Sequence, residues 1–217
     1  MILILAFSSC ANSYKDYYYQ LEDFEIPKYY VFKTTEDTTQ VQYWKVSSDL
    51  KKKLLITEVF DKNFKSIEYF SEKHGSKGAE LVEFNQIQDT TITRTTPIDK
   101  QVFLWNPKTS YKYSVNYEDQ NGPTEFSKTR ELIGLDSVTV FNEKFEALKM
   151  KGSYHIKYKK FNQTNFFWQY SFYTKDHGFV KYVRFFSDQT IRTLLVDSIL
   201  CEDEWNSLMK SRPLQNP

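Results

Sequence analysis

Alternation of apolar and polar residues is the feature of this sequence that most restricts its fold. In the run YKYSVNY (111–117) every second residue is aromatic or apolar, and the residues between are polar. Successive side chains of a β-strand point to opposite faces of a sheet, so this run predicts a strand with one buried face. The runs at 154–159 and 166–174 repeat the pattern. These segments therefore indicate β-sheet.

Further strand-like runs fill the first half of the chain, and turn-forming residues separate them. These runs lie at 29–34, 40–47, 53–60, 64–72 and 79–87. Strands that recur about every 8–12 residues are typical of antiparallel all-β proteins, and no strand is followed by a long helix. We predict a mainly β protein: an antiparallel curved sheet, arranged as a half-barrel or a sandwich, with a short C-terminal helix.

Two segments depart from the strand pattern. The Thr-rich stretch 89–97 either separates two β layers or forms an exposed edge strand, and Pro97 favours the edge because proline cannot donate to a sheet ladder. The stretch 201–210 has acidic residues at its start and Lys210 at its end, as a helix dipole prefers. We expect a helix there. Its expected buried face consists of Leu200, Trp205, Leu208 and Met209.

The aromatic content, 18 Phe, 16 Tyr and 4 Trp, permits two interpretations. Aromatic side chains fill a β core, or they line a concave apolar cavity for a small ligand. For the second case we expect the aromatic face of 166–172 to lie opposite the face that begins at Tyr111. The candidate ligand-binding residues are Tyr111, Tyr113, Val115, Phe166, Trp168, Tyr170 and Phe172.

The first ten residues bear on localisation. Met1–Phe7 is apolar but far shorter than the ~20 residues of a membrane-spanning helix. The stretch AFSSC, which ends at Cys10, resembles the lipobox of bacterial lipoproteins. The resemblance implies a signal peptide that is removed and a lipid on Cys10, while the alternative is a buried strand at 2–7. Ala11 resembles the outer-membrane sorting context of Gram-negative lipoproteins.

These features predict three parts. Residues 1–9 are the remnant of a signal peptide, 10–25 are the lipidated cysteine and a tether, and 26–217 are a single β-rich domain. Tyr17–Tyr19 in the tether are expected to dock on the domain or at lipid head groups. The resemblance implies a lipid anchor in the outer membrane of the cell envelope, with the domain facing the periplasm.

A second resemblance lies in the C-terminal half. The segment DSVTVFNEKFEALKMKG (136–152), followed by FWQYSFYTKDHGFVKYVRFF (167–186), is similar to uncharacterised bacterial envelope proteins. Such proteins often share the curved half-barrel of the Lol-type lipoprotein carriers. The resemblance covers 136–195 and implies a fold more than a function.

The sequence nominates no reaction. His74, His155 and His177 have no neighbours at metal-ligand spacing, and no nucleophile elbow, phosphate loop or zinc-protease motif occurs. His155 is expected at the surface, and the other two histidines in turns. With 29 basic and 28 acidic residues, the chain shows no excess of positive charge for nucleic acid. We therefore expect no catalysis, metal, cofactor or nucleic-acid partner.

The second cysteine, Cys201, is 191 positions from Cys10, and their spacing does not support a disulfide. We expect Cys201 to be a partly buried residue at the start of the last helix.

Three functions stay open. The first is a membrane-anchored protein whose domain binds an apolar or lipid-like ligand, and it predicts an internal cavity. The second is an anchored scaffold that acts through an envelope protein partner, and it predicts a filled core with an exposed apolar patch. The third is an enzyme with a dispersed site, and it predicts polar groups with perturbed pKa values in a cleft.

Overall fold

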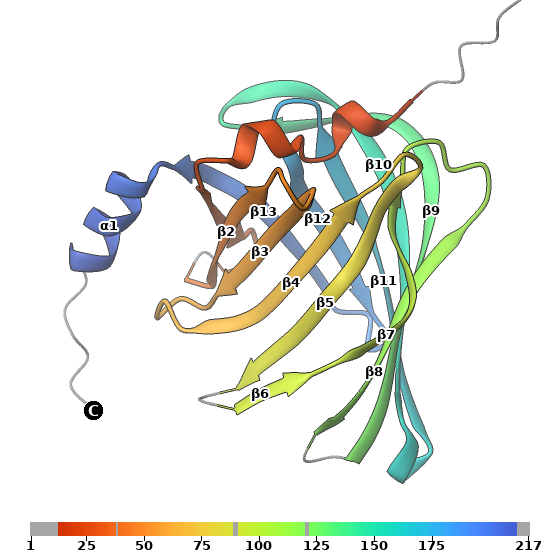
Figure 1. The fold of residues 1–217 in the computed structure, drawn as a ribbon. Coiled ribbons are helices and arrows are strands. Elements are labelled where there is room, and N and C mark those ends of the chain that lie inside the picture. Colours follow the sequence, from red (N-terminus) through yellow and green to blue (C-terminus); the bar gives the residue numbers. More distant parts are fainter. Residues whose placement is uncertain (1–12, 38, 89–90, 120–121, 212–217) are drawn as a thin grey trace, which may run out of the picture.

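The structure is a computed structural model that describes residues 13–37, 39–88, 91–119 and 122–211. Thirteen strands in this part form one antiparallel sheet (Figure 1). They are β1 (Lys28–Thr34), β2 (Val41–Asp49), β3 (Leu54–Phe60), β4 (Ser66–His74), β5 (Gly78–Gln88), β6 (Thr91–Arg94), β7 (Thr96–Leu104), β8 (Tyr111–Asp119), β9 (Gly122–Val140), β10 (Glu143–Tyr158), β11 (Gln163–Thr174), β12 (Gly178–Phe186) and β13 (Ile191–Leu200). The mainly β, antiparallel prediction is confirmed.

The sheet closes on itself into a barrel of 12 strands. Consecutive strands pair from β1 to β5 and from β7 to β13, and β5 pairs with β7. β1 also pairs with β13 along Tyr29–Thr34, which joins the first strand to the last. The short β6 pairs only with β5 among the described strands and lies outside the ring. The prediction of a half-barrel or sandwich, and the Lol-type half-barrel implied by resemblance, are therefore wrong. Closure removes the free edges that an open sheet would expose.

Part of the Thr-rich stretch, β6, forms an edge strand, since it pairs only with β5 among the described strands. Pro97 itself lies in β7, which pairs with both β5 and β8, so it does not mark the edge strand. A two-residue hairpin joins β9 to β10. Phe141 and Asn142 have φ values of 53° and 63°, as a type I′ turn requires.

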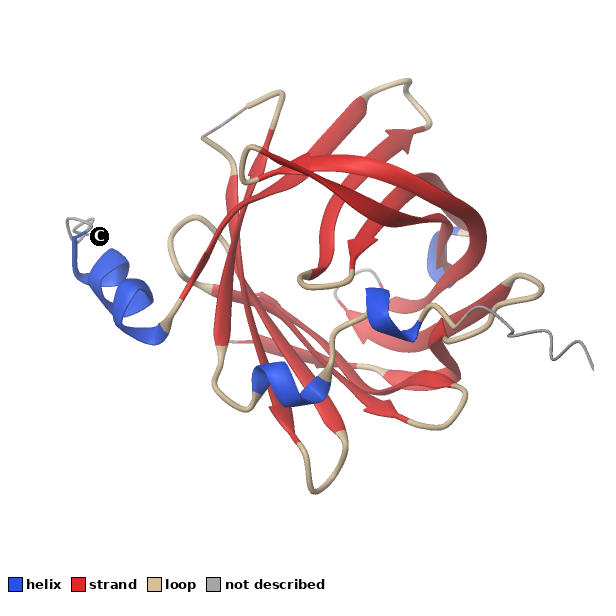
Figure 2. Cartoon of the chain, turned by 90° about the horizontal axis from the view of Figure 1, so that it is seen from above, coloured by secondary structure: helices blue, strands red, loops and turns tan. Residues whose placement is uncertain are grey.

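Two short 3-10 helices, η1 (Lys15–Tyr17) and η2 (Leu21–Phe24), lie across one end of the barrel (Figures 1 and 2). We call residues 14–24 the plug. Tyr17, Tyr18, Tyr19 and Phe24 are buried in the main core, and the Tyr14 N–H donates to the Trp105 carbonyl at 2.8 Å. The described part of the expected tether thus packs against the barrel, with its three tyrosines on the protein.

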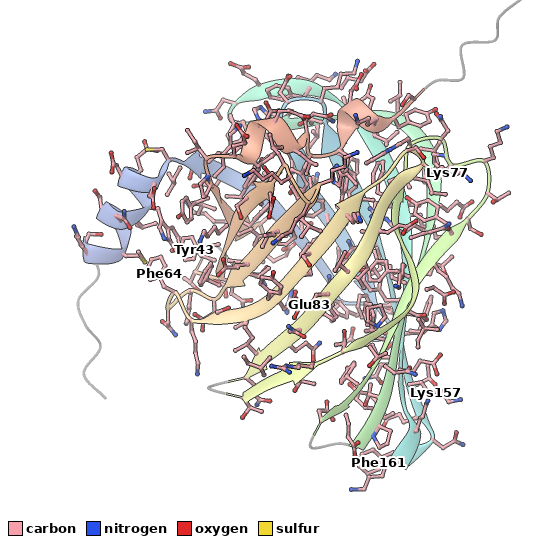
Figure 3. The ribbon with its side chains drawn as sticks, in the orientation of Figure 1. Tyr43, Phe64, Lys77, Glu83, Lys157 and Phe161 are labelled. Carbon is pink, nitrogen blue, oxygen red and sulfur yellow. The ribbon has the colours of Figure 1, made fainter. Side chains whose placement is uncertain are left out.

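Helix α1 (Glu202–Ser211) packs on the outside of the barrel. The Trp205 ring stacks on Tyr29 at 4.8 Å and meets Tyr43 at 5.2 Å. Figure 3 shows Tyr43 and Phe64 beside this helix. Leu200 and Leu208 pack in the same cluster, as expected. Met209 is 40% exposed, so the expectation that it is buried is wrong.

The Cys201 side chain is free and exposed, so the expectation of partial burial is wrong. Its backbone N–H donates to Glu204 Oε2 at 2.8 Å. This is the reciprocal half of a capping box, in which the third helical residue reaches back to the residue that precedes the helix. Cys201 thus occupies a helix-capping position, where the side chain points to solvent.

Candidate functional site

The barrel encloses a cavity of about 340 Å³. Its wall is largely aromatic, with charged groups along its depth. The lining residues become less exposed toward the plug: they are partly exposed at the far end and fully buried next to Tyr18. We call the end under the plug the closed end and the opposite end the open end.

The closed end is formed by plug and barrel residues together. The Tyr18 hydroxyl donates to Glu72 Oε2 at 2.6 Å, and the Tyr18 ring lies 4.4 Å from the Phe103 ring. Burial raises the pKa of the Glu72 carboxyl to about 7, although the hydrogen bond from Tyr18 and the nearby Arg130 and Lys128 act in the opposite direction. Burial and the Glu72 carboxylate together raise the pKa of Tyr18.

Arg130 is held beside this pair on β9. Its Nη1 donates to the Val102 carbonyl at 2.7 Å, and its Nη2 donates to the Tyr173 hydroxyl. The guanidinium also lies over the Phe103 and Tyr173 rings, at 5.5 and 5.3 Å. Two donors of Arg130 are therefore used by the protein, while its Nε has no hydrogen-bond partner among the described residues.

The middle of the cavity holds two further cations. Lys128 Nζ lies 4.6 Å from the centre of the Tyr154 ring and 5.9 Å from that of Tyr113. The Arg184 guanidinium lies 5.5 Å from the same Tyr154 ring, and its Nε donates to Gln169 Oε1 at 3.0 Å. Both cations contact Tyr154, so Lys128 and Arg184 lie in the same part of the cavity.

A glycine provides the space for Lys128. A Cβ on Gly152 would lie 3.1 Å from Lys128 Cε and 3.2 Å from Tyr154 Cε2, closer than side chains normally approach. Strand β10 therefore has no side chain at the point where Lys128 crosses the inner face. Burial, and then the charges of Arg130 and Arg184, hold the pKa of Lys128 well below its usual range.

Two carboxylates face these three cations. Glu72 lies at the closed end, and Glu68 precedes it by four residues on the inner face of β4. Burial raises the pKa of Glu68, while Arg184 and Lys128 act to lower it. Within the described part of the chain, no ion pair joins any of the five groups.

The open end is lined by half-buried side chains. They are Gln86 and five apolar residues, Ile67, Phe84, Phe126, Ile156 and Phe167. We call these five apolar residues the apolar ring. Phe161 in η3 (Lys159–Phe161) lies at the far tip of the molecule, beyond this end of the barrel (Figure 3), and is 56% exposed.

The structure separates the seven candidate ligand-binding residues. On β8, Tyr113 lines the cavity, whereas Tyr111 and Val115 are packed in the core on the same face. On β11, Gln169, Ser171 and Tyr173 line the cavity. Alternation along the strand therefore puts the other four candidates, Phe166, Trp168, Tyr170 and Phe172, on the outer face. Cys10 lies outside the described residues.

The outward-facing residues of β11 join a neighbour on β12. Trp168 stacks on Phe185 at 3.9 Å, and Tyr170 meets both rings edge-on, at 5.2 and 6.2 Å. We call Phe166, Trp168, Tyr170, Phe172 and Phe185 the outer aromatic strip. Lys149, Lys151 and Lys181 lie over its rings.

The inner charges were missed by the sequence analysis. Lys128 and Arg130 lie on the same face of β9 as Phe126, at every second position. Glu68 and Glu72 lie in the same way on one face of β4, with Phe70 between them. Charged residues at every second position normally mark a solvent-facing side. The available signal was that these charges share a face with an aromatic residue.

The histidines occupy three different settings. His155 is exposed, as expected, and His177 lies in the turn before β12. His74 is not in a turn but ends β4, where it is buried against Tyr18 and Trp105. Burial lowers its pKa to about 4. No group of His, Cys, Asp and Glu residues able to hold a metal ion occurs among the described residues.

Comparison with known proteins finds similarity only in structure. No family model and no curated protein matches the sequence. A candidate lipoprotein of Parabacteroides distasonis aligns with a TM-score of 0.53 at 12% identity, over 81% of this chain and 95% of that one. A candidate exported protein of Bacteroides fragilis with a YmcC-like fold aligns with a TM-score of 0.50 at 11% identity, over 82% and 97%.

The hypothetical lipoprotein YmcC of Escherichia coli aligns with a TM-score of 0.41 at 8% identity, over 86% of this chain and 90% of that one. In the part of the chain that the structure describes, no helix is long and apolar enough to span a membrane. At these identities the first two comparisons establish a shared fold: this chain has the fold of two proteins described as a candidate lipoprotein and a candidate exported protein.

Proposed function

We propose that this protein is a lipid-anchored lipoprotein of the cell envelope whose barrel binds an apolar, lipid-like ligand without catalysis. The observation that carries the proposal is the aromatic-lined cavity of about 340 Å³ inside the barrel. Small-molecule sites have volumes of about 300–1,000 Å³ and are mostly apolar with a few polar groups. An internal cavity is what the ligand-binding alternative predicted.

The anchoring part of the proposal rests on the sequence. AFSSC ends at Cys10, the residue that a lipobox would modify, and Ala11 follows it. The two structural neighbours, a candidate lipoprotein and a candidate exported protein, support a place in the envelope. The outer membrane, and a domain that faces the periplasm, are the corresponding proposal for location. Several acyl chains on one cysteine give stable anchoring, whereas one alone does not.

The perturbed pKa values of Glu72 and Lys128 are what the enzyme alternative predicted. Burial is the largest cause of both shifts, and it acts on any charged group inside a barrel. The nearest cavity partner of Glu72 is a tyrosine hydroxyl of the plug. We therefore propose a binding role for these groups, with no reaction assigned to them.

The outer aromatic strip favours a second candidate function, that of a scaffold. Phe166 is 44% exposed, and Trp168, Tyr170 and Phe185 are half-buried on an outer face. The three lysines over the strip suit an envelope protein partner with an acidic surface.

Native mass spectrometry of the full chain with Cys10→Ala, purified without detergent, tests the ligand proposal. We expect an adduct of lipid mass that is reduced by Phe126→Ala in the apolar ring and retained by Trp168→Ala in the outer strip. A protein that carries no adduct and binds no added lipid would contradict ligand binding. A partner captured by the parent chain and lost in Trp168→Ala would favour the scaffold.

Fractionation tests the anchor separately. Cys10→Ala should move the protein from the membrane to the soluble fraction without a change in its circular dichroism spectrum. Retention of the variant in the membrane, or no incorporation of labelled palmitate by the parent chain, would contradict lipidation of Cys10.

A further inference from the structure

The charges inside the barrel do not balance. Lys128, Arg130 and Arg184 face the cavity from β9 and β12, and Glu68 and Glu72 face it from β4. Three cations against two carboxylates leave one positive charge in excess. Glu72 is already engaged by the Tyr18 hydroxyl at the closed end. The unmatched charge therefore falls in the middle of the cavity.

The two mid-cavity cations keep donors available. Arg184 gives its Nε to Gln169, but no hydrogen bond of its terminal Nη atoms occurs within the described part of the chain. Lys128 Nζ makes no hydrogen bond or ion pair to a described residue, and its protein contacts are the faces of Tyr154 and Tyr113. Arg130 differs, because Val102 and Tyr173 already accept from it.

Burial makes this arrangement unfavourable without an anion. Lys128 is only 9% exposed. A buried cation is costly unless it is paired and hydrogen-bonded. Aromatic faces attract a cation, but more weakly than a carboxylate or phosphate does. An anion between Lys128 and Arg184 would supply the missing charge and accept from both side chains.

The closed end fixes the direction of a bound molecule. Tyr18 and the rest of the plug cover the cavity beyond Arg130, so a ligand can extend only toward the open end. The apolar ring lies along that path, between the cations and solvent. The cavity thus presents positive charge at mid-depth and apolar side chains outside it. This order matches an amphiphile that enters with its head group first.

We propose that the ligand of this cavity carries an acidic head group, a carboxylate or a phosphate, which Lys128 and Arg184 bind while its apolar chain lies along the apolar ring. This inference rests on the proposed function, because it specifies the ligand of that same cavity. Gly152 belongs to the site, since its missing side chain leaves room for Lys128.

Three probes with a twelve-carbon chain test the inference: dodecanoate and dodecyl phosphate, each used below its micelle concentration, and dodecanol, used below its solubility limit. Titration calorimetry with the full chain carrying Cys10→Ala and stripped of lipid gives the three affinities. A charge-assisted hydrogen bond contributes about 1.5–3 kcal/mol, so we expect at least one anionic probe to bind about ten- to a hundredfold more tightly than dodecanol. Comparison of the two anions distinguishes a carboxylate from a phosphate ligand.

Variants then assign the effect to the two cations. Lys128→Met and Arg184→Met should remove most of the preference for the anion and leave dodecanol affinity within a few-fold of the parent chain. Lys151→Met, which changes a lysine on the outer face over Trp168, is the matched control and should keep the preference. A preference that survives in Lys128→Met and Arg184→Met would overturn the assignment to these residues.

The outcomes separate the two proposals. Equal affinities for all three probes would overturn the acidic head group while ligand binding stands. Failure of every probe to bind would overturn ligand binding as well. Should a variant not fold, as judged by circular dichroism, the comparison of the three probes on the parent chain still decides the inference.

Discussion

The two ends of the barrel differ in how completely their side chains are enclosed. At the closed end, Tyr18 is 4% exposed and Phe103 is fully buried, and their rings lie 4.4 Å apart. At the open end, Phe126 and Phe167 are only half-buried. Complete burial makes the closed end a source of stability, while partial exposure leaves the open end accessible. The closed end thus stabilises the fold, while the opposite end gives a ligand access to the cavity.

Truncation of the plug should have the largest effect on stability. Tyr18→Ala removes a fully buried ring and leaves Glu72 without its hydroxyl donor. Large-to-small changes of buried aromatic residues cost about 3–5 kcal/mol. We expect a loss of that size in the free energy of unfolding, measured with urea. Phe126→Ala at the open end is the matched change, and an equal loss there would break the comparison between the ends.

Glu72 should make stability depend on pH. Its pKa is about 7 in the folded protein and about 4.5 when unfolded, so the folded state prefers the protonated form. The free energy of unfolding should therefore fall as pH rises from about 4.5 to about 7, by at most about 3 kcal/mol.

Glu72→Gln isolates this contribution, because glutamine keeps an oxygen that accepts from Tyr18. The variant should gain stability relative to the parent chain between pH 4.5 and 8, as measured by urea unfolding at each pH. A difference between the two proteins that does not change with pH would show that Glu72 titrates near its unfolded value.

The glycine that begins β12 should affect stability because it lies against a tyrosine of the plug. Gly178 has φ +65°, and a Cβ there would lie 2.4 Å from the Tyr19 ring. Gly178→Ala should cost about 2–3 kcal/mol, from backbone strain and from the displaced ring. In the Tyr19→Ala background only the strain remains, so the double-mutant cycle should show coupling of about 1 kcal/mol or more. Additive effects would indicate that the plug does not press on this turn.

The outer aromatic strip should have the smallest effect on the ligand. Trp168→Ala removes a half-buried ring that stacks on Phe185, so we expect a loss of about 1 kcal/mol in stability and no change in probe affinity. Phe126→Ala should instead weaken dodecanoate binding several-fold, as measured by calorimetry. A fall in affinity with Trp168→Ala would mean that the ligand reaches the outer face.

The strands, the turns and the helix were predictable because each depends on local pattern. The period of two at 111–117 and the capping acid Glu204 act within a few residues. Closure depends on the pairing of β1 with β13, segments far apart in sequence, and alternation does not say which strands are neighbours. The face of β8 that was expected to point inward does so. The face of β11 that was expected to point inward points outward. Aromatic residues occupy both faces of β11, and only closure of the barrel decides which face is inside.

The charged part of the candidate site could not be predicted for a related reason. A strand such as 126–130, with lysine and arginine at alternate positions, has the pattern of a solvent-facing side. A closed barrel has an interior that admits such side chains when a cavity and aromatic faces surround them. The apolar–polar pattern thus indicates two faces and leaves open which one is inside.

The hydrogen bond from Tyr14 to Trp105 has a consequence for orientation. Tyr14 is four positions after Cys10 in the sequence, and four steps of extended chain span at most about 14 Å. A lipid on Cys10 would therefore hold the barrel upright, with its plugged end down on the bilayer. The apolar ring would then open away from the membrane.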